Sequence, residues 1–198
     1  DGANTVGAYA VGAVAQNGSL TAQQMLAQPR AVYITLNVEP ANDTANSAQA
    51  VAALKSAFVI ALNPYFSAVA DTADVILPTV PFTETGGTFV NAEGRAQTFN
   101  PVVKPLGEAR PAWKVLRVLG ERLDIQSPAF SANDVNDIRA AVAPVLAELP
   151  ARLANGSSAV AQAAQVADGW VRSTRVNPYA VDAVVRREKK KKKTKWAQ

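Results

Sequence analysis

The residues best suited to recognise a ligand lie in one short segment, 84–97, with the sequence ETGGTFVNAEGRAQ. It combines the acidic side chains of Glu84 and Glu93 with the guanidinium of Arg95. A planar guanidinium can bind a phosphate or a carboxylate through two parallel hydrogen bonds. The same group can instead form an internal ion pair with Glu93 or Glu84 that holds the loop in place. We favour this structural interpretation of Arg95 over a ligand contact.

The rest of the chain contains no motif of a self-sufficient active site. It has no Cys and no His, which excludes disulfides and iron–sulfur clusters in this sequence and argues against zinc or haem. It also lacks the glycine-rich phosphate-binding patterns and the Gly-x-Ser-x-Gly nucleophile motif. Oxygen ligands alone favour magnesium or calcium. We therefore predict that the isolated chain binds no transition metal and does not oxidise NADH.

The elements that must position this loop alternate between strand and helix patterns. Strands rich in β-branched and apolar residues are predicted at 31–37, 58–63 and 74–77, and helices at 21–28, 46–57 and 67–73. Asn46 is a suitable N-cap for the alanine-rich second helix. The alternation predicts an α/β fold: a doubly wound, mostly parallel sheet with flanking helices, in which the three strands are neighbours.

Polar and turn-forming residues follow each predicted strand. They occupy the segments 37–40, 63–67 and 78–87. Because the carboxyl ends of parallel strands meet at one edge of a sheet, these segments can converge there and face a ligand or a neighbouring domain. The alternative is that they are simply strand-to-helix turns, since Asn-Pro and Glu-Pro commonly begin turns.

The loop itself is predicted to contain a small hairpin. Gly86 and Gly87 allow backbone angles that would let the chain turn sharply after the third strand. The segments 88–91 and 96–100 then form two short strands, joined by a turn that carries Glu93 and Arg95.

Two further helices are predicted downstream. The first starts at Pro111 and places Trp113, Leu116, Leu119 and Leu123 on a face that packs on the sheet. The second spans 133–150 and should be kinked or split at Pro144. We predict an α/β domain at 1–125, a helical and irregular carboxyl-terminal extension at 126–185, and a disordered basic tail at 186–198.

The net charge of +4 comes from the basic tail, RREKKKKKTKWAQ, and the rest of the chain is mildly acidic. Such a block repels itself and could bind nucleic acid or an anionic membrane nonspecifically. We favour a solvated tail with no specific nucleic acid partner, because no aromatic residues interleave with the lysines. The sequence also has no apolar run of about 18 residues and no secretory signal, so we expect neither a membrane span nor export.

The order and spacing of residues in 74–120 carry a family resemblance. Three parts of this segment are typical of the molybdopterin oxidoreductase superfamily. They are the acid of ADVILP, the run E-x-x-GTFVN-x-EGR-x-Q and the segment GEARPAWKVLRVLG. Within the superfamily they most closely resemble the large G subunits of bacterial NADH:quinone oxidoreductase, respiratory complex I. The resemblance extends over roughly 1–125. It implies that the loop corresponds to the cofactor-pocket loop of molybdenum-containing relatives, through Glu84, Gly87, Thr88, Asn91, Glu93, Arg95 and Gln97.

The resemblance implies a noncatalytic scaffold role. The G subunits generally carry this domain without molybdenum, so the pocket is expected to be a relic and the fragment to hold no cofactor. Iron–sulfur clusters are expected in an amino-terminal part absent from this sequence, and the partners are other peripheral-arm subunits at the cytoplasmic face of the plasma membrane. Two alternatives remain: a molybdopterin-binding domain of a true molybdenum enzyme such as a formate dehydrogenase, or a basic-tailed nucleic-acid or membrane-surface binder.

Overall fold

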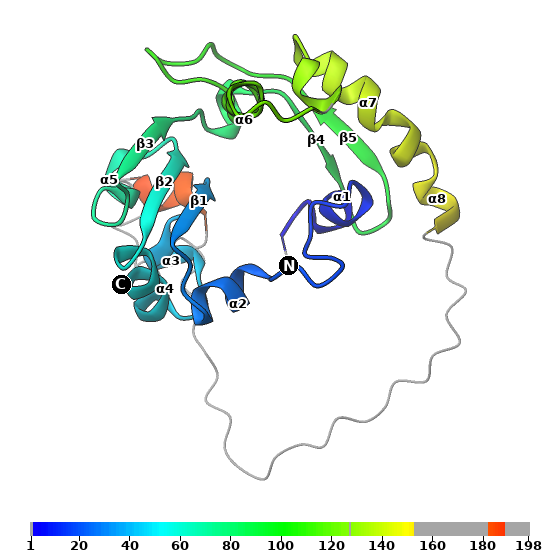
Figure 1. The fold of residues 1–198 in the computed structure, drawn as a ribbon. Helices are drawn as coiled ribbons and strands as arrows, with labels where there is room; N and C mark the ends of the chain where they lie inside the picture. Colours follow the sequence, from blue (N-terminus) through cyan, green and yellow to red (C-terminus); the bar gives the residue numbers. More distant parts are fainter. Residues whose placement is uncertain (1, 127, 153–181, 189–198) are drawn as a thin grey trace, which may run out of the picture. The chain divides into compact units, whose positions relative to one another are not determined.

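The computed structural model describes residues 2–126, 128–152 and 182–188. The chain divides into two compact units, 1–154 and 155–198. Figure 1 shows the order of the elements along the chain, with their labels. All of the elements below belong to the first unit, with the exception of α9.

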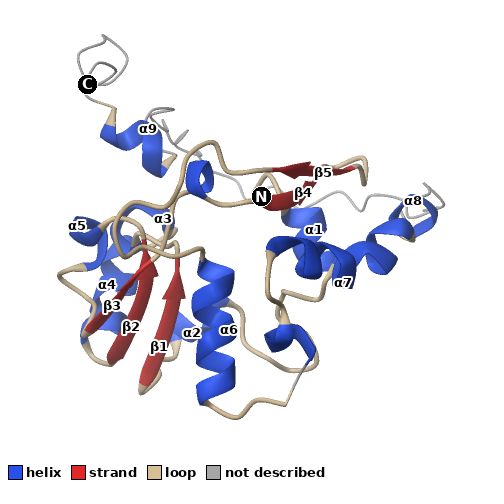
Figure 2. Ribbon diagram, turned by 90° about the horizontal axis from the view of Figure 1, so that it is seen from above, coloured by secondary structure: helices blue, strands red, loops and turns tan. Residues whose placement is uncertain are grey.

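A parallel sheet forms the centre of the first unit. Its strands are β1 (Val32–Leu36), β2 (Phe58–Asn63) and β3 (Val75–Pro78), in the order β1-β2-β3. Both pairs are parallel, and Leu62 in the central strand is in register with Leu36 on one side and Leu77 on the other. Figure 2 shows the three strands running side by side. The predicted α/β fold with three neighbouring parallel strands is confirmed.

Short helices precede, connect and follow these strands. They are α1 (Thr5–Ala10), α2 (Ala22–Ala27), α3 (Pro40–Asp43), α4 (Ser47–Lys55) and α5 (Phe66–Val69). Asn46 caps α4 by accepting a hydrogen bond from the Gln49 backbone N–H, at 3.1 Å. Thr21 and Gln24 form a reciprocal capping box at the start of α2. These caps satisfy backbone donors that a helix start leaves without intrahelical partners, and they confirm the predicted starts of both helices.

One face of the sheet carries the main apolar core. Tyr33, Leu54 and Val59 are buried there, and Met25 and Leu26 of α2 pack against them. The Tyr33 hydroxyl is hydrogen-bonded as well, because it donates to the Met25 carbonyl at 2.8 Å. A tyrosine can therefore be buried at this position without leaving its polar atom unpaired.

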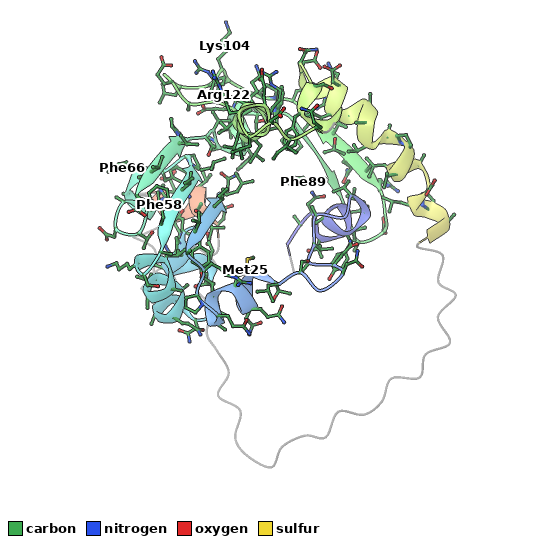
Figure 3. The ribbon with its side chains drawn as sticks, in the orientation of Figure 1. Met25, Phe58, Phe66, Phe89, Lys104 and Arg122 are labelled. Carbon is green, nitrogen blue, oxygen red and sulfur yellow. The ribbon has the colours of Figure 1, made fainter. Side chains whose placement is uncertain are left out.

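The opposite face of the sheet is only partly covered in this unit. Alternate residues of a strand point to opposite faces, so Val32 and Ile34 point away from Tyr33, and the register places Phe58 beside Val32. Val32 and Ile34 are each 53% exposed and Phe58 is 48% exposed; Phe58 is labelled in Figure 3. The described residues thus leave an apolar area open on this face.

The predicted hairpin is present and consists of β4 (Gly87–Val90) and β5 (Ala96–Phe99), paired antiparallel. The structural role of Gly86 and Gly87 in the hairpin differs from the predicted one. Neither Gly86 nor Gly87 has a positive φ. Instead, a Cβ at Gly87 would lie 2.6 Å from the ring of Phe99. Glycine is required there to make room for an aromatic ring, and the positive φ of +78° occurs at Gly94 in the turn.

The 3₁₀ turn η1 (Phe82–Glu84) precedes the hairpin. The elements after the hairpin are α6 (Ala112–Arg122), the 3₁₀ turn η2 (Pro128–Ser131), α7 (Val135–Ala147) and α8 (Leu149–Arg152). α7 continues through Pro144, so the predicted split there is wrong and the break comes at Glu148. α6 begins after Pro111 as predicted and packs against η2. Leu123, predicted to face the sheet, is 60% exposed.

In the second unit the structure describes α9 (Ala183–Arg187), which Asp182 caps. Arg186 and Arg187 form its last turn, so the basic segment is helical at its start. The predicted disorder of 189–198, and half of the predicted 126–185 extension, lie outside the described residues. The predicted boundary after residue 125 remains a prediction. None of the helices in the described ranges is long and apolar enough to cross a membrane.

Candidate functional site

Polar side chains meet where the three parallel strands end, which was one of the two arrangements that the sequence left open. The Thr79 hydroxyl donates to Asn37 Oδ1 at 3.2 Å, which links the segments after β3 and β1. Asn63, the last residue of β2, donates from Nδ2 to the Val38 carbonyl at 3.1 Å and accepts the Tyr65 N–H at 2.8 Å. Asn63 is 4% and Thr79 2% exposed. Hydrogen bonds among the strand ends therefore join them into one polar cluster, in which Asn63 and Thr79 are buried and Asn37 is exposed.

Asn37 has an unusual backbone conformation in this cluster. Its φ is +52°, in the left-handed region that asparagine tolerates better than most other residues. Its backbone N–H donates to the Leu62 carbonyl at 2.8 Å, which continues the β1–β2 pairing by one residue. The conformation lets the chain leave the sheet immediately after that bond.

A buried carboxylate lies next to the cluster. Glu39 precedes α3 and is 4% exposed. Asn42 Nδ2 donates to Glu39 Oε2 at 3.3 Å, and the Glu39 backbone N–H donates to Asp43 Oδ2 at 2.8 Å. A buried carboxylate needs such partners to offset its lost hydration. Both acids are therefore held by local hydrogen bonds at the entrance to α3.

The seven residues assigned to the cofactor-pocket loop are not brought together at one point. Glu84 Oε2 accepts the Leu106 backbone N–H at 3.0 Å. Asn91 Oδ1 accepts the backbone N–H groups of Glu93 and Arg95, at 3.1 and 2.9 Å, so its side chain shapes the hairpin turn. The other members are Gly87 and Thr88 in β4, and the exposed side chains of Glu93, Arg95 and Gln97.

The predicted ion pair of Arg95 is wrong. Among the described residues, Arg110 pairs with Glu108 at 3.3 Å, whereas Arg95 forms no ion pair with Glu84 or Glu93. Arg95 is exposed, and Glu93 and Arg95 both lie in a turn that backbone and Asn91 hydrogen bonds already hold. A salt bridge is not needed to fix this loop.

Arg95→Ala is expected to change the free energy of unfolding by less than about 0.5 kcal/mol, because an exposed arginine without an ion pair contributes little. The turn should keep its shape, since Asn91 makes its hydrogen bonds to backbone atoms. Urea unfolding of the two proteins measures the difference. A loss of 2 kcal/mol or more would show that Arg95 pairs with a buried carboxylate after all.

The residues present do not fit a molybdopterin cofactor. Recognition of a large polar cofactor requires several free donors and acceptors that converge on one pocket. Here the Glu84 side chain accepts the Leu106 N–H and the Asn91 side chain accepts N–H groups of the hairpin turn, and Arg95 and Gln97 are exposed. At the strand ends, Asn63 and Thr79 bond to neighbouring protein groups. Nor do the described residues contain a group of three or more His, Cys, Asp or Glu that could hold a metal ion.

Arg139 in α7 lies beside the loop, and it was not identified from the sequence as a candidate site residue. Its Nη2 donates to the Phe99 carbonyl at 2.7 Å, to Asn100 Oδ1 at 3.2 Å and to the Gly87 carbonyl at 3.4 Å. It thus ties α7 to both strands of the hairpin. A signal was available, because Arg139 interrupts the apolar helical pattern of Val135, Ile138 and Val142.

Comparison with known proteins places most of this first unit in one family. Residues 1–122 match the molybdopterin oxidoreductase family. The mitochondrial 78 kDa subunit of NADH-ubiquinone oxidoreductase from Candida albicans is 43% identical over 74 residues, which are 37% of this chain and 10% of that protein. The Neurospora crassa 78 kDa subunit is 34% identical over 92 residues, which are 46% of this chain and 12% of that protein.

A second kind of relative occurs as well. A putative formate dehydrogenase from Staphylococcus aureus is 32% identical over 90 residues, which are 46% of this chain and 9% of that protein. The chain thus matches only about a tenth of the length of these curated relatives. The family match covers more than half of the chain and includes the parallel sheet and the hairpin. The chain belongs to the molybdopterin oxidoreductase family.

Proposed function

We propose that this chain is a structural domain of the large peripheral-arm subunit of an NADH:quinone oxidoreductase, with no active site of its own. Two relatives are named as 78 kDa subunits of NADH-ubiquinone oxidoreductase. In this role the domain supports electron transfer from NADH to quinone without carrying electrons. The iron–sulfur clusters belong to other parts of the protein, because this chain has no Cys to bind them.

The observation that carries this proposal is the hydrogen-bonded polar cluster at the strand ends, with Asn63 and Thr79 buried in it. In an open α/β sheet this edge is the usual place for a ligand. Here Asn37, Asn63 and Thr79 bond to one another or to nearby backbone groups, and Asn63 and Thr79 are nearly inaccessible to solvent. Their polar groups stabilise the fold at the position where an enzyme of this architecture would bind its cofactor.

The open face of the sheet supports a role within a larger assembly. Val32, Ile34 and Phe58 leave roughly half of their surfaces in water, and adjoining exposed apolar side chains are typical of surfaces that pack against other protein. We infer that other parts of the complete protein, or other peripheral-arm subunits, contact this domain. The inferred location is the cytoplasmic side of the plasma membrane, attached peripherally through the complex.

Purification of the full-length parent protein from its native host tests the proposal. The expected result is copurification with other subunits of an NADH:quinone oxidoreductase, with iron in the preparation but no stoichiometric molybdenum and no fluorescent pterin after oxidative extraction. A matched preparation of the parent, from which the segment corresponding to residues 1–154 of this chain has been deleted, should still contain its iron. Loss of all iron on this deletion would contradict the purely structural role.

The second candidate is a cofactor-binding domain of a molybdopterin-dependent enzyme, which the likeness to a putative formate dehydrogenase favours. The same purification separates the two functions. Molybdenum at about one atom per chain, pterin fluorescence and formate-dependent dye reduction would support this second function and overturn the first. In that case the loop would have to rearrange so that the Glu84 and Asn91 side-chain oxygens release the backbone N–H groups from which they accept hydrogen bonds.

A further inference from the structure

An apolar groove lies between α1, β4 and α7, apart from the polar cluster at the strand ends. Its volume is about 350 Å³, within the size range of small-molecule sites. Asn4 connects two of its walls, because Asn4 Oδ1 accepts the Val90 backbone N–H at 2.8 Å. The apolar lining includes Ala8, Val11, Val90, Ile138, Val142 and Leu146. Figure 2 shows α1 and α7 on the same side of the hairpin.

One cation lies in the wall of this groove. Arg139 is its only charged lining residue. The guanidinium donates only to neutral acceptors: the carbonyls of Gly87 and Phe99, and the side-chain amides of Asn100 and Asn136. Its Nε is buried and has no hydrogen-bond partner. Arg139 therefore carries a full positive charge next to apolar side chains, and no carboxylate of the described residues pairs with it.

The hairpin is shaped to bring this cation close. A Cβ at Gly86 would lie 3.4 Å from Arg139 Nη2 and 3.3 Å from the Phe99 carbonyl oxygen. A larger residue at this position would press on the guanidinium and on the backbone atom that it binds. The bare backbone at Gly86 thus allows Arg139 to remain at the wall of the groove.

We propose that this groove binds an apolar monocarboxylate, such as a medium-chain fatty acid. The carboxylate neutralises the Arg139 guanidinium, and the alkyl chain covers the apolar lining formed by Val90, Val142 and Leu146. A monoanion suits the site better than a phosphate monoester, because Arg139 is the only cation in the lining and a second negative charge would have no partner. This inference is independent of the proposed structural function.

Fluorescence of Trp113, which lines the groove, can report binding. The full chain carrying Trp170→Phe and Trp196→Phe has Trp113 as its only tryptophan. The probes are hexanoate, octanoate, decanoate and the uncharged decanol. Decanoate should produce a saturable change and bind at least about tenfold more tightly than decanol. Each added methylene should raise the affinity about fourfold until the groove is filled, as expected from hydrophobic burial.

Substitution of Arg139 separates charge pairing from simple apolar binding. Arg139→Gln should lower the affinity for decanoate at least tenfold more than the affinity for decanol, because loss of the α7–hairpin hydrogen bonds affects both ligands whereas loss of the charge affects only the carboxylate. The matched control Arg122→Gln, at an exposed arginine of α6 that is labelled in Figure 3, should change neither. If Arg139→Gln does not fold, Val142→Phe fills the groove instead and should weaken both ligands. Equal affinities for decanoate and decanol, or no saturable signal with decanoate, would overturn the proposal.

Discussion

Leu62→Ala is expected to lower the free energy of unfolding by about 3 to 5 kcal/mol, the largest effect of the substitutions proposed. Leu62 has no solvent-exposed surface. It lies in the central strand, in register with a neighbour on each side, so the surrounding backbone cannot readily collapse into the space left by the removed side chain. The cost therefore combines lost apolar burial with the cavity that remains.

Urea unfolding measured by far-ultraviolet circular dichroism tests this expectation. The matched control is Leu106→Ala, which makes the same chemical change at a side chain that is 80% exposed. The control should shift stability by less than about 0.5 kcal/mol. Similar midpoints for the two variants would show that β2 is not the centre of the folded core.

Gly120→Val is expected to destabilise the protein by about 3 kcal/mol. An added Cβ at Gly120 would lie 2.4 Å from the Phe130 ring, and three ring atoms would be closer than 3 Å. Valine adds two methyl groups to that clash, so α6 and η2 would have to separate. In a helix without such a neighbour, replacing glycine would instead add stability, by about 1 kcal/mol for alanine.

A double-mutant cycle with Phe130→Ala distinguishes a steric conflict with this ring from a general intolerance of α6 to a β-branched residue at position 120. Removal of the ring creates space, so Gly120→Val should cost at least about 2 kcal/mol less in the Phe130→Ala background than in the wild type. Equal costs in both backgrounds would show that Phe130 does not pack on Gly120. The same unfolding measurement serves all four proteins.

Local sequence signals were sufficient for the sheet and for the starts of its helices. The strands at β1, β2 and β3 follow from short apolar runs rich in β-branched residues, and the parallel arrangement follows from the helices between them. Caps at Thr21 and Asn46 were readable because they act on backbone groups within the next three residues. The convergence of polar residues at the strand ends was predictable for the same topological reason.

Tertiary contacts decided the character of the loop and of the groove. Arg95 was expected to pair with a nearby acid, but Asn91 holds the turn through backbone hydrogen bonds and leaves Arg95 in solvent. The role of Gly87 depends on Phe99 across the hairpin, and the position of Arg139 depends on a backbone carbonyl 40 residues earlier. These interactions join residues that are distant in sequence, so neither periodicity nor local spacing encodes them.

By itself the sequence determined the α/β class, the parallel sheet, the hairpin and the family resemblance, because these depend on local patterning and on short motifs that keep their order. Only the tertiary structure decided which polar groups remain available. The buried side chains of Asn63 and Thr79 are hydrogen-bonded to nearby backbone groups and to Asn37, whereas the charge of Arg139 is surrounded by neutral acceptors and apolar side chains. The physical reason is that whether a polar side chain can bind a ligand depends on the partners it finds after the chain has folded.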